Sequence, residues 1–265
     1  MPDFIFTLRI LTAAVLLLAG SVTWAEEPEN YTLQTFPKPE PRVARYASEP
    51  ITVDGRLEEP VWKKAAVYSF SLGHDSIKKG AELEENGKVR LAWDKRFLYL
   101  AVDLEDADVQ AEGTEDHEFH FLKGEVAELF LKHRDHPHYF ELYVTPKGHK
   151  SCFYLTKSGG KLEIKRDMPL VVAAMVNGTL NDSSDRDRGW TAEMAVPAEV
   201  LTAGGPDFGP GSAWTMLVGR YNYSQRRGKD DPELTSSPKL LLTSFHFLQL
   251  YAPIAFEHGE ENGEK

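Results

Sequence analysis

The sequence contains a single cysteine, Cys152, among its 265 residues. One cysteine excludes an internal disulfide framework, so the folded chain must be stabilised by its hydrophobic core. No cysteine lies near the N-terminal apolar segment described below, and this argues against a lipid-anchored lipoprotein.

Positive charge is scarce. The 30 Lys and Arg residues are outnumbered by 41 Asp and Glu, which gives a formal net charge of −11. A chain without a basic stripe is not expected to bind nucleic acid or an anionic membrane surface. Acidity is weakly consistent with calcium or with neutral ligands such as sugars, but solubility is the better explanation of it.

Long apolar runs are confined to the N-terminus. Arg9 precedes the apolar stretch Ile10–Gly20, which is too short to span a bilayer, and Thr23–Ala25 resembles a cleavage site. The acidic segment Glu26–Glu29 follows at once. We interpret residues 1–25 as a signal peptide, which predicts a secreted or periplasmic protein with no membrane span; the alternative is a buried N-terminal helix or strand.

The sequence also lacks internal repeats and any long amphipathic helix. The sequence does contain short alternating apolar segments. The clearest is Val89–Asp106, where two apolar runs flank the polar residues Asp94–Arg96. Alternating aromatic and aliphatic residues with a short charged break predict a β-hairpin. Leu98–Leu104 is apolar at almost every position, so this strand is expected to be covered on both faces.

Roughly ten short strands separated by turn residues predict an all-β fold. We expect a two-sheet antiparallel β-sandwich of the jelly-roll or immunoglobulin-like type, or a barrel, with one or two short helical turns. One domain is expected at residues 51–256, with a helical turn within Leu57–Ala66. A proline-rich extended leader at 26–50 would precede the domain, and an acidic tail at 257–265 would follow it.

Strand alternation predicts which side chains share a face. In the expected strands Val126–Lys132, His138–Thr145 and Trp190–Val196, the apolar residues form one set and leave glutamates on the other face. Carboxylates accept hydrogen bonds from sugar hydroxyls, and aromatic rings stack on sugars. Glu128, Glu141 and Glu193 could therefore belong to a saccharide site. The alternative is a structural network in which Arg220 or Lys132 neutralises them.

Several segments in a fixed order carry a family resemblance. They are Val53–Gly55 with Glu59 and Trp62, then Val89–Leu100, Glu125–Leu131, Tyr139–Val144 and Gly189–Pro197. Together they resemble family 9 carbohydrate-binding modules, a branch of the DOMON-like β-sandwich group, over residues 51–256. The resemblance implies a two-sheet sandwich that binds sugars, often carries structural calcium and performs no catalysis itself.

The resemblance also implies a site. In sugar-binding members two aromatic side chains clamp one sugar, while a Glu, an Arg and amides bind its hydroxyls. Glu128 falls on the family's Glu, whereas Glu141 stands in place of the Arg and Tyr143 in place of an amide. Phe245 corresponds to one clamp residue, and Phe121 or Leu122 to the other. The expected carbohydrate-binding residues are Glu128, Glu141, Tyr139, Tyr143, Phe121, Arg220 and Phe245.

Two acidic loops are candidates for structural Ca²⁺, which prefers oxygen ligands. One contains Asp182, Asp185 and Asp187, and the other contains Asp103 and Asp106. Neither has the spacing of an EF-hand, and solvated Asx-turn loops explain the pattern as well.

Three functions are compatible with these observations. The first is a non-catalytic carbohydrate-binding protein that binds a saccharide or polysaccharide and acts beside secreted glycoside hydrolases in carbohydrate catabolism. The second is a glycoside hydrolase that uses two of the glutamates. The third is a DOMON-type haem or electron-transfer domain, which would need Met and His ligands. Met168, Met175 and His246 are available but match no motif.

The targeting interpretation predicts that the exported chain begins near Glu26. Mass spectrometry of protein recovered from the periplasm or medium should find residues 1–25 removed. An exported product that retains Met1, or one that stays with the membrane, would contradict it.

Overall fold

The computed structural model describes residues 31–156, 162–224 and 231–259. The expected signal peptide and the last residues of the acidic tail lie outside these ranges. The chain divides into the units Met1–Asn30 and Tyr31–Lys265, and the described residues all belong to the second unit. Within the described residues, no helix combines the length and hydropathy needed to cross a membrane.

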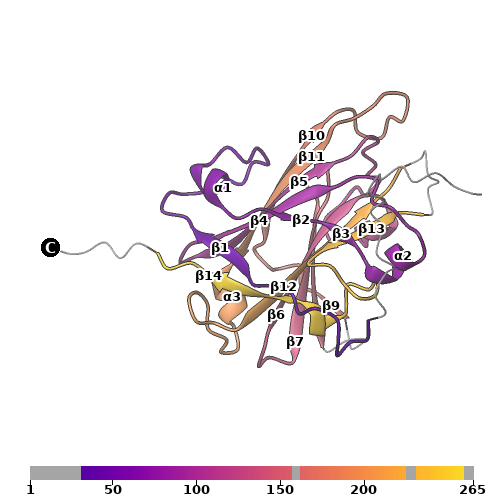
Figure 1. Cartoon of the computed structure of the whole chain (residues 1–265). Coiled ribbons are helices and arrows are strands. Elements are labelled where there is room, and N and C mark those ends of the chain that lie inside the picture. The colour runs from indigo at the N-terminus through magenta and orange to yellow at the C-terminus, as the bar shows by residue number, and fades with distance from the viewer. Residues whose placement is uncertain (1–30, 157–161, 225–230, 260–265) are drawn as a thin grey trace, which may run out of the picture. The chain divides into compact units, whose positions relative to one another are not determined.

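The fold is mostly β, with one strongly curled mixed sheet and a few short helices (Figure 1). Along the sheet the strands follow the order β10-β11-β5-β4-β1-β14-β12-β6-β7-β8-β9. The strands are β1 (Arg42–Tyr46), β2 (Tyr68–Ser69), β3 (Ser71–Leu72), β4 (Gly87–Trp93), β5 (Phe97–Glu105), β6 (Val126–His133), β7 (His138–Val144), β8 (Lys150–Thr156), β9 (Leu162–Ile164), β10 (Val171–Asn177), β11 (Gly189–Pro197), β12 (Trp214–Asn222), β13 (Glu233–Ser237) and β14 (Ala252–Phe256). The short helices are α1 (Pro60–Lys64), α2 (His74–Lys78), α3 (Ala198–Thr202), η1 (His120–Leu122) and η2 (Leu248–Leu250).

The curl brings two parts of the sheet face to face around one core. We call β10, β11, β5 and β4 the first half, and β12, β6, β7 and β8 the second half. Leu100 and Met194 of the first half share a buried cluster with Leu129 and Met216 of the second. The predicted all-β class is therefore confirmed, and the arrangement is sandwich-like, although a single sheet supplies both halves.

The predicted hairpin is confirmed as β4 and β5. Its turn is closed by Asp94, whose Oδ1 accepts hydrogen bonds from the backbone N–H groups of Arg96 and Phe97 at 2.7 and 2.8 Å. As expected, β5 is covered on both faces: Leu100 lies in the main core, and Ala101 lies in a cluster beneath α1. A strand buried on both sides explains the nearly continuous apolar sequence.

Residues 26–50 were expected to form an extended leader outside the domain, but residues 42–46 of this range form strand β1. This strand lies inside the sheet, parallel to both of its neighbours: Ala44 is paired with Leu91 of β4 and with Phe256 of β14. The sheet is thus mixed rather than purely antiparallel, while the other strand pairs of the described ranges are antiparallel. Only Ala44 of β1 is fully buried, so the segment shows no apolar periodicity in the sequence.

Two polar segments of the sequence also contain regular structure. Gly73–Asn86 contains α2, and Ser224–Lys239 contains β13, which pairs with β12 and β3. The expected helical turn within Leu57–Ala66 is confirmed as α1, which begins at Pro60. Proline is favoured there because the first helical N–H has no partner within the helix.

Glu193 faces away from the main core, as strand parity predicts, but it lies on the outer face of the first half. There α1 and its preceding loop bury it. Its Oε1 accepts a hydrogen bond from the Trp62 indole at 2.8 Å, and its Oε2 accepts from the backbone N–H groups of Asp54 and Gly55 at 3.0 and 2.9 Å. Glu193 is therefore separated from Glu128 and Glu141, and its visible role is structural.

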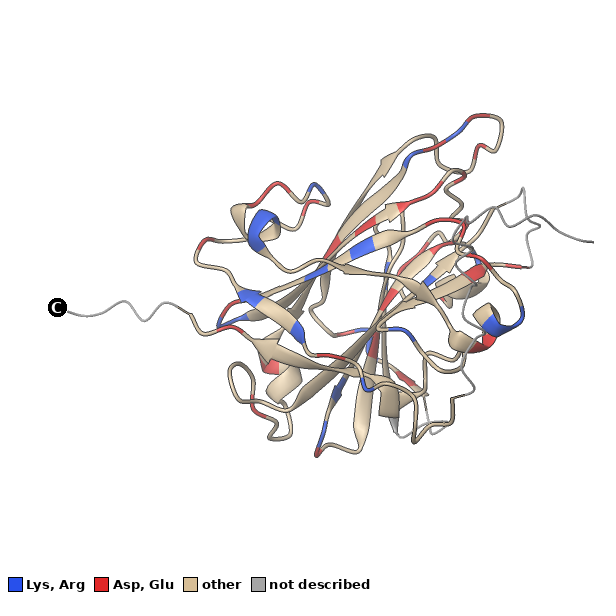
Figure 2. Ribbon diagram, viewed as in Figure 1, with Lys and Arg blue, Asp and Glu red and all other residues tan. Residues whose placement is uncertain are grey.

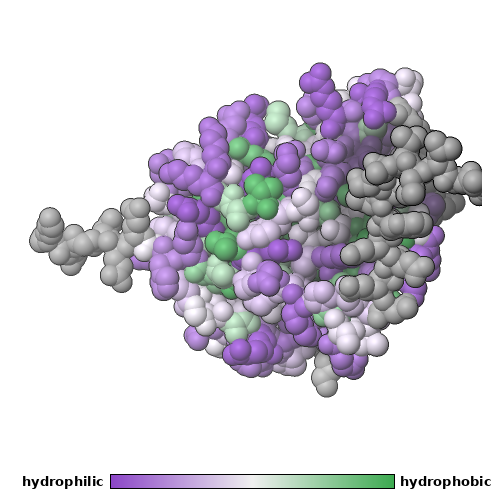
Figure 3. All heavy atoms as spheres, in the orientation of Figure 1, coloured by the Kyte–Doolittle hydropathy of each residue, from purple (hydrophilic) through white to green (hydrophobic). Residues whose placement is uncertain are grey.

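The described surface is mixed in character. In Figure 2, Lys and Arg are scattered among Asp and Glu along the strands and loops rather than gathered into one stripe. On the face drawn in Figure 3, hydrophobic residues form separate patches between hydrophilic ones. Neither view shows a broad surface of a single charge or a broad hydrophobic surface.

The Glu193 contacts predict a stability effect without a sugar-binding effect. Glu193→Ala removes the acceptor for three donors, and loss of charged hydrogen bonds at a buried site should lower the free energy of unfolding by roughly 3 kcal/mol. Urea denaturation measures this change, with Glu193→Gln as the milder comparison. A Glu193→Ala protein as stable as the wild type would contradict the assignment.

Candidate functional site

The face of β6 and β7 opposite the core was expected to carry a saccharide site, and the structure shows that this face is largely covered. Phe130 and Tyr143 of this face belong to a second hydrophobic cluster with Phe36 and Leu250. Residues 31–36 and 240–251 contribute to that cover. The parity prediction is confirmed, since Ala127, Leu129 and Leu131 point into the main core, but the opposite face is also buried.

A pocket of about 280 Å³ remains between this face and the covering loop. Glu128 reaches it from β6, Glu141 and Tyr143 from β7, and Tyr221 from β12. The remaining walls come from η1, from β13 and from the loop of residues 243–246. Its lining residues are Phe121, Glu128, Glu141, Tyr143, Tyr221, Leu234, Thr243, Ser244, Phe245 and His246.

Strand register explains why these side chains meet. Glu128 is paired with Tyr143 on one side and with Gly219 on the other. The absence of a side chain at Gly219 lets Phe245 pack directly on β12, because a Cβ there would lie 2.6 Å from the Phe245 ring. Gly219 therefore positions one wall of the pocket.

Three aromatic rings form a continuous wall. The ring centroids of Phe121 and Tyr221 are 5.6 Å apart, and those of Tyr221 and Phe245 are also 5.6 Å apart at an interplanar angle of 89°. Tyr221 was not among the expected site residues, although it shares strand parity with Gly219 opposite Glu128. Phe245 and Phe121 both lie at the pocket, whereas Leu122, the alternative to Phe121 as the second clamp residue, is 70% exposed and is absent from the lining.

Glu128 and Glu141 form a buried carboxyl pair. The Tyr143 hydroxyl donates a hydrogen bond to Glu141 Oε1. Glu128 is only 2% exposed, and its Oε1 has no hydrogen-bond partner among the described residues. Among those residues, the pocket lining contains neither Lys nor Arg.

Burial without a cation shifts the titration of both glutamates. Burial, followed by repulsion from Glu141, raises the pKa of Glu128 well above its ordinary value, although the Tyr143 hydroxyl partly offsets the rise. Burial also raises the pKa of Glu141 to about 7, again against the hydrogen bond from Tyr143. The pair is therefore protonated at pH values where ordinary carboxylates are ionised.

His246 and Tyr139 lie beside this pair. The Tyr139 hydroxyl and His246 Nδ1 share a hydrogen bond of 2.9 Å, and the same Nδ1 is 4.0 Å from Glu141 Oε2. Burial lowers the pKa of His246, so its ring is uncharged at neutral pH and does not neutralise Glu141. Tyr139 thus supports a pocket residue without lining the pocket itself.

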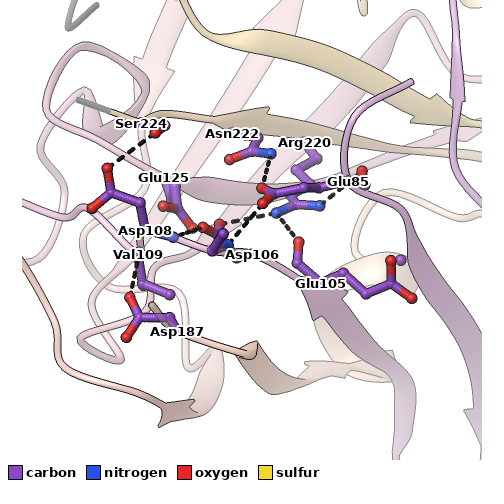
Figure 4. A network of polar contacts seen from close by, with 12 residues as sticks. Glu85, Glu105, Asp106, Asp108, Val109, Glu125, Asp187, Arg220, Asn222 and Ser224 are labelled. Atoms are coloured by element: carbon purple, nitrogen blue, oxygen red, sulfur yellow. Dashed lines mark hydrogen bonds and ion pairs between the residues drawn. The ribbon is translucent and has the colours of Figure 1, made fainter. Parts of the chain in front are cut away.

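Arg220 was expected to bind sugar, but in the structure it is a buried core residue. It is 0% exposed and points to the face opposite Glu128, since its neighbour Gly219 is the residue paired with Glu128. Its Nη2 contacts Asp106 Oδ2 at 3.0 Å and the Glu105 carbonyl at 2.7 Å (Figure 4). Lys132 donates to backbone carbonyls of its own hairpin, so neither base neutralises the pocket glutamates.

The two acidic loops lie side by side, but the expected calcium ligands already have protein partners. Asp187 accepts hydrogen bonds from the N–H groups of Thr179 and Val109 at 2.6 and 2.7 Å, and Figure 4 shows its place beside Val109. Asp106 is paired with Arg220.

The other three expected ligands are exposed or partly exposed. Asp182 accepts from the Ser184 backbone and hydroxyl, Asp103 lies 3.8 Å from Lys88 Nζ, and Asp185 is exposed. Within the described part of the chain, no three His, Cys, Asp or Glu side chains are arranged to hold a metal ion. These residues do not fit a preformed calcium site, and calcium stays a prediction of the resemblance.

The residues considered for haem ligation are also separated. Met168 is buried in the main core, Met175 is exposed on β10, and His246 lies at the pocket. This geometry gives no support to a Met–His axial pair.

Comparison with known proteins agrees with the family resemblance. The model of the family described as carbohydrate family 9 binding domain-like matches residues 53–210. A Bacteroides uniformis protein described as carbohydrate-binding has a TM-score of 0.63 at 13% identity, and the match covers 82% of this chain and 99% of that one.

Two further similar structures are family 9 carbohydrate-binding modules from Caldicellulosiruptor kristjanssonii. One, in complex with cellotriose, has a TM-score of 0.54 at 13% identity and covers 84% of this chain and 97% of its own. The other, with glucose, has a TM-score of 0.53 at 12% identity and covers 85% and 100%. At these identities the structures show a shared fold alone. No curated protein sequence matched the chain.

The carboxyl pair predicts that stability decreases as pH rises. Because the folded-state pKa of Glu141 is about 7 against an ordinary 4.5, the folded protein binds more protons than the unfolded chain across this interval. Glu141 alone should therefore cost on the order of 3 kcal/mol of unfolding free energy between pH 4.5 and pH 8.

Glu141→Gln should remove the contribution of Glu141 to this dependence, leaving that of Glu128, and should be more stable than the wild type at pH 8. Urea denaturation at pH 5 and pH 8 measures both quantities, and the exposed Glu58→Gln serves as the control. Parallel pH profiles for the wild type and Glu141→Gln would show that Glu141 titrates normally.

Proposed function

The chain belongs to the carbohydrate family 9 binding domain-like family, and from that premise we propose that it is a non-catalytic protein that binds a mono- or oligosaccharide or a glycan end. We place binding in the pocket that contains Glu128, Glu141 and Tyr143. Its biological setting, in this proposal, is carbohydrate catabolism after export through the N-terminal signal, with saccharide or polysaccharide as ligand and secreted glycoside hydrolases as companions.

The observation that carries the proposal is the combination of aromatic and carboxyl groups in one pocket. Phe121, Tyr221 and Phe245 offer ring faces and edges for the apolar face of a sugar, while Glu128 and Glu141 offer acceptors for its polar groups. Tyr143 and His246 add further hydrogen-bonding atoms. This is the composition expected of a small polar ligand that also has apolar faces.

Pocket size favours a single sugar unit. A volume of about 280 Å³ lies near the lower end of small-molecule sites, which measure roughly 300–1,000 Å³. The bound glucose and cellotriose of the Caldicellulosiruptor modules support a ligand of this class. We propose that one sugar unit enters the pocket and that any further units extend outward.

A glycoside hydrolase is the alternative, because two carboxyls with raised pKa values share the pocket. Glycoside hydrolysis requires one ionised carboxylate and one protonated acid with room for a glycosidic bond between them. Here burial raises the pKa of both groups, and one hydroxyl, that of Tyr143, interacts with both. The geometry and the family together favour binding without turnover.

Calorimetry of the chain from Glu26 onward, titrated with glucose and short glucans, tests the proposed binding. We expect dissociation constants in the micromolar to millimolar range, about −8 to −4 kcal/mol. Glu128→Ala should weaken binding by about 1.5–3 kcal/mol if a charge-assisted hydrogen bond is lost. Phe121→Ala, which removes a stacking wall, should also weaken it.

Glu58→Ala, at an exposed position outside the pocket lining, should bind as the wild type does. Melting curves for each variant separate lost binding from lost folding. A fully folded Glu128→Ala with unchanged affinity would overturn the site assignment, and release of reducing sugar from the titrated glucans would overturn the non-catalytic assignment.

A further inference from the structure

The pocket is unusual in its charge. Two carboxyl side chains line it, and the described residues place no Lys or Arg among its walls. The titratable neighbours are the phenols of Tyr143 and Tyr221 and the imidazole of His246, with Tyr139 behind it. Burial and the carboxylates raise the pKa values of the tyrosines, and burial lowers that of His246, so these neighbours are neutral near pH 7.

Hydrogen-bond donors are also too few for this pair. The Tyr143 hydroxyl has one proton, which it donates to Glu141. Glu128 Oε1 is buried and has no partner within the described ranges. Ionised carboxylates that are buried without donors are costly, which is why this pair holds its protons to an unusually high pH, and a cationic donor supplied by a ligand would take the place of those protons.

We infer that this pocket recognises an amino sugar with a free, protonated amino group, whose ammonium is bound by Glu128 and Glu141. The inference rests on the proposed saccharide-binding function and specifies the class of sugar. An ammonium supplies three donors and one positive charge, which match two carboxyls that lack both. The aromatic wall of Phe121, Tyr221 and Phe245 accommodates the sugar ring and also favours a cation near its faces.

A metal ion fits the Glu128 and Glu141 pair less well than an ammonium does. Calcium takes six to eight oxygen ligands, whereas this pocket presents two carboxyls on an aromatic wall. The described residues also contain no group of three acidic, His or Cys side chains arranged around a metal. An organic cation with apolar faces uses both kinds of wall.

Calorimetry with glucosamine, glucose and N-acetylglucosamine at equal ionic strength tests the inference. Glucosamine should bind roughly ten- to one-hundred-fold more tightly than the two neutral sugars at pH 7, the ratio expected for a charge-assisted hydrogen bond. Because the pair still holds protons near pH 7, binding of the ammonium must release them, and the higher proton concentration at pH 5 opposes that release, so the preference should shrink there. Methylammonium, which has the charge without the ring, should bind far more weakly than glucosamine.

Glu128→Gln and Glu141→Gln keep the shape of the pocket and should each bring the glucosamine-to-glucose affinity ratio close to one. The exposed Glu58→Gln should leave the ratio unchanged, and excess chelator should have no effect on it. If the Gln variants fail to fold, the comparison of sugars and pH values on the wild-type protein still decides.

The outcomes separate this inference from the function on which it rests. Glucose binding as tightly as glucosamine would overturn the inference and leave saccharide binding standing. Methylammonium binding as tightly as glucosamine would show a simple cation site and overturn the amino-sugar assignment. Failure of every sugar to bind would overturn both.

Discussion

The alternation of side chains along β6 is the constraint on which the rest of the second half depends. Residues on one side of the strand enter the core between the halves, and residues on the other side meet the cover formed by segments 31–36 and 240–251. Both faces are buried, so a shift by one residue would place Glu128 in the main core and move Leu129 to the pocket face. This two-sided burial holds the pocket carboxyl in one position.

The protein stabilises its buried carboxylates in three different ways. Asp106 has a cation, Arg220, within 3.0 Å. Glu193 has no cation but accepts three hydrogen bonds from N–H donors. Glu128 and Glu141 have only the hydroxyl of Tyr143, and they line a pocket. Strongly perturbed carboxyls in a pocket are a recognised mark of functional sites, whereas the first two arrangements serve the fold.

The cover over the pocket depends on chain segments far apart in sequence. The strand β1 lies between β4 and β14, so it joins the two halves of the sheet and places the preceding residues 31–36 against the second half. The loop before β14 supplies Phe245 and His246 to the same side. The pocket is thus formed where the loop of residues 243–246 meets the outer face of β6 and β7, while residues 31–36 pack in the hydrophobic cluster beside it.

The local features of this protein can be predicted from its amino-acid sequence. The hairpin around Asp94, the two-sided burial of β5, the helical turn at Pro60 and the core-facing sets of β6 and β7 all follow from turn chemistry and from side-chain alternation. These depend on residues close together in the chain. The family was also evident from an ordered series of such local patterns, and it is confirmed by the matching family model.

The tertiary structure alone decided what lies opposite each face. Parity placed Glu128, Glu141 and Glu193 away from the core, but it could not show that the first two share a covered pocket while α1 buries the third. Nor could it show that Arg220 pairs with Asp106, a residue 114 positions away. Alternation specifies the side of a strand, whereas charge pairing and burial depend on which distant segment packs there, and that is settled only when the curled sheet closes.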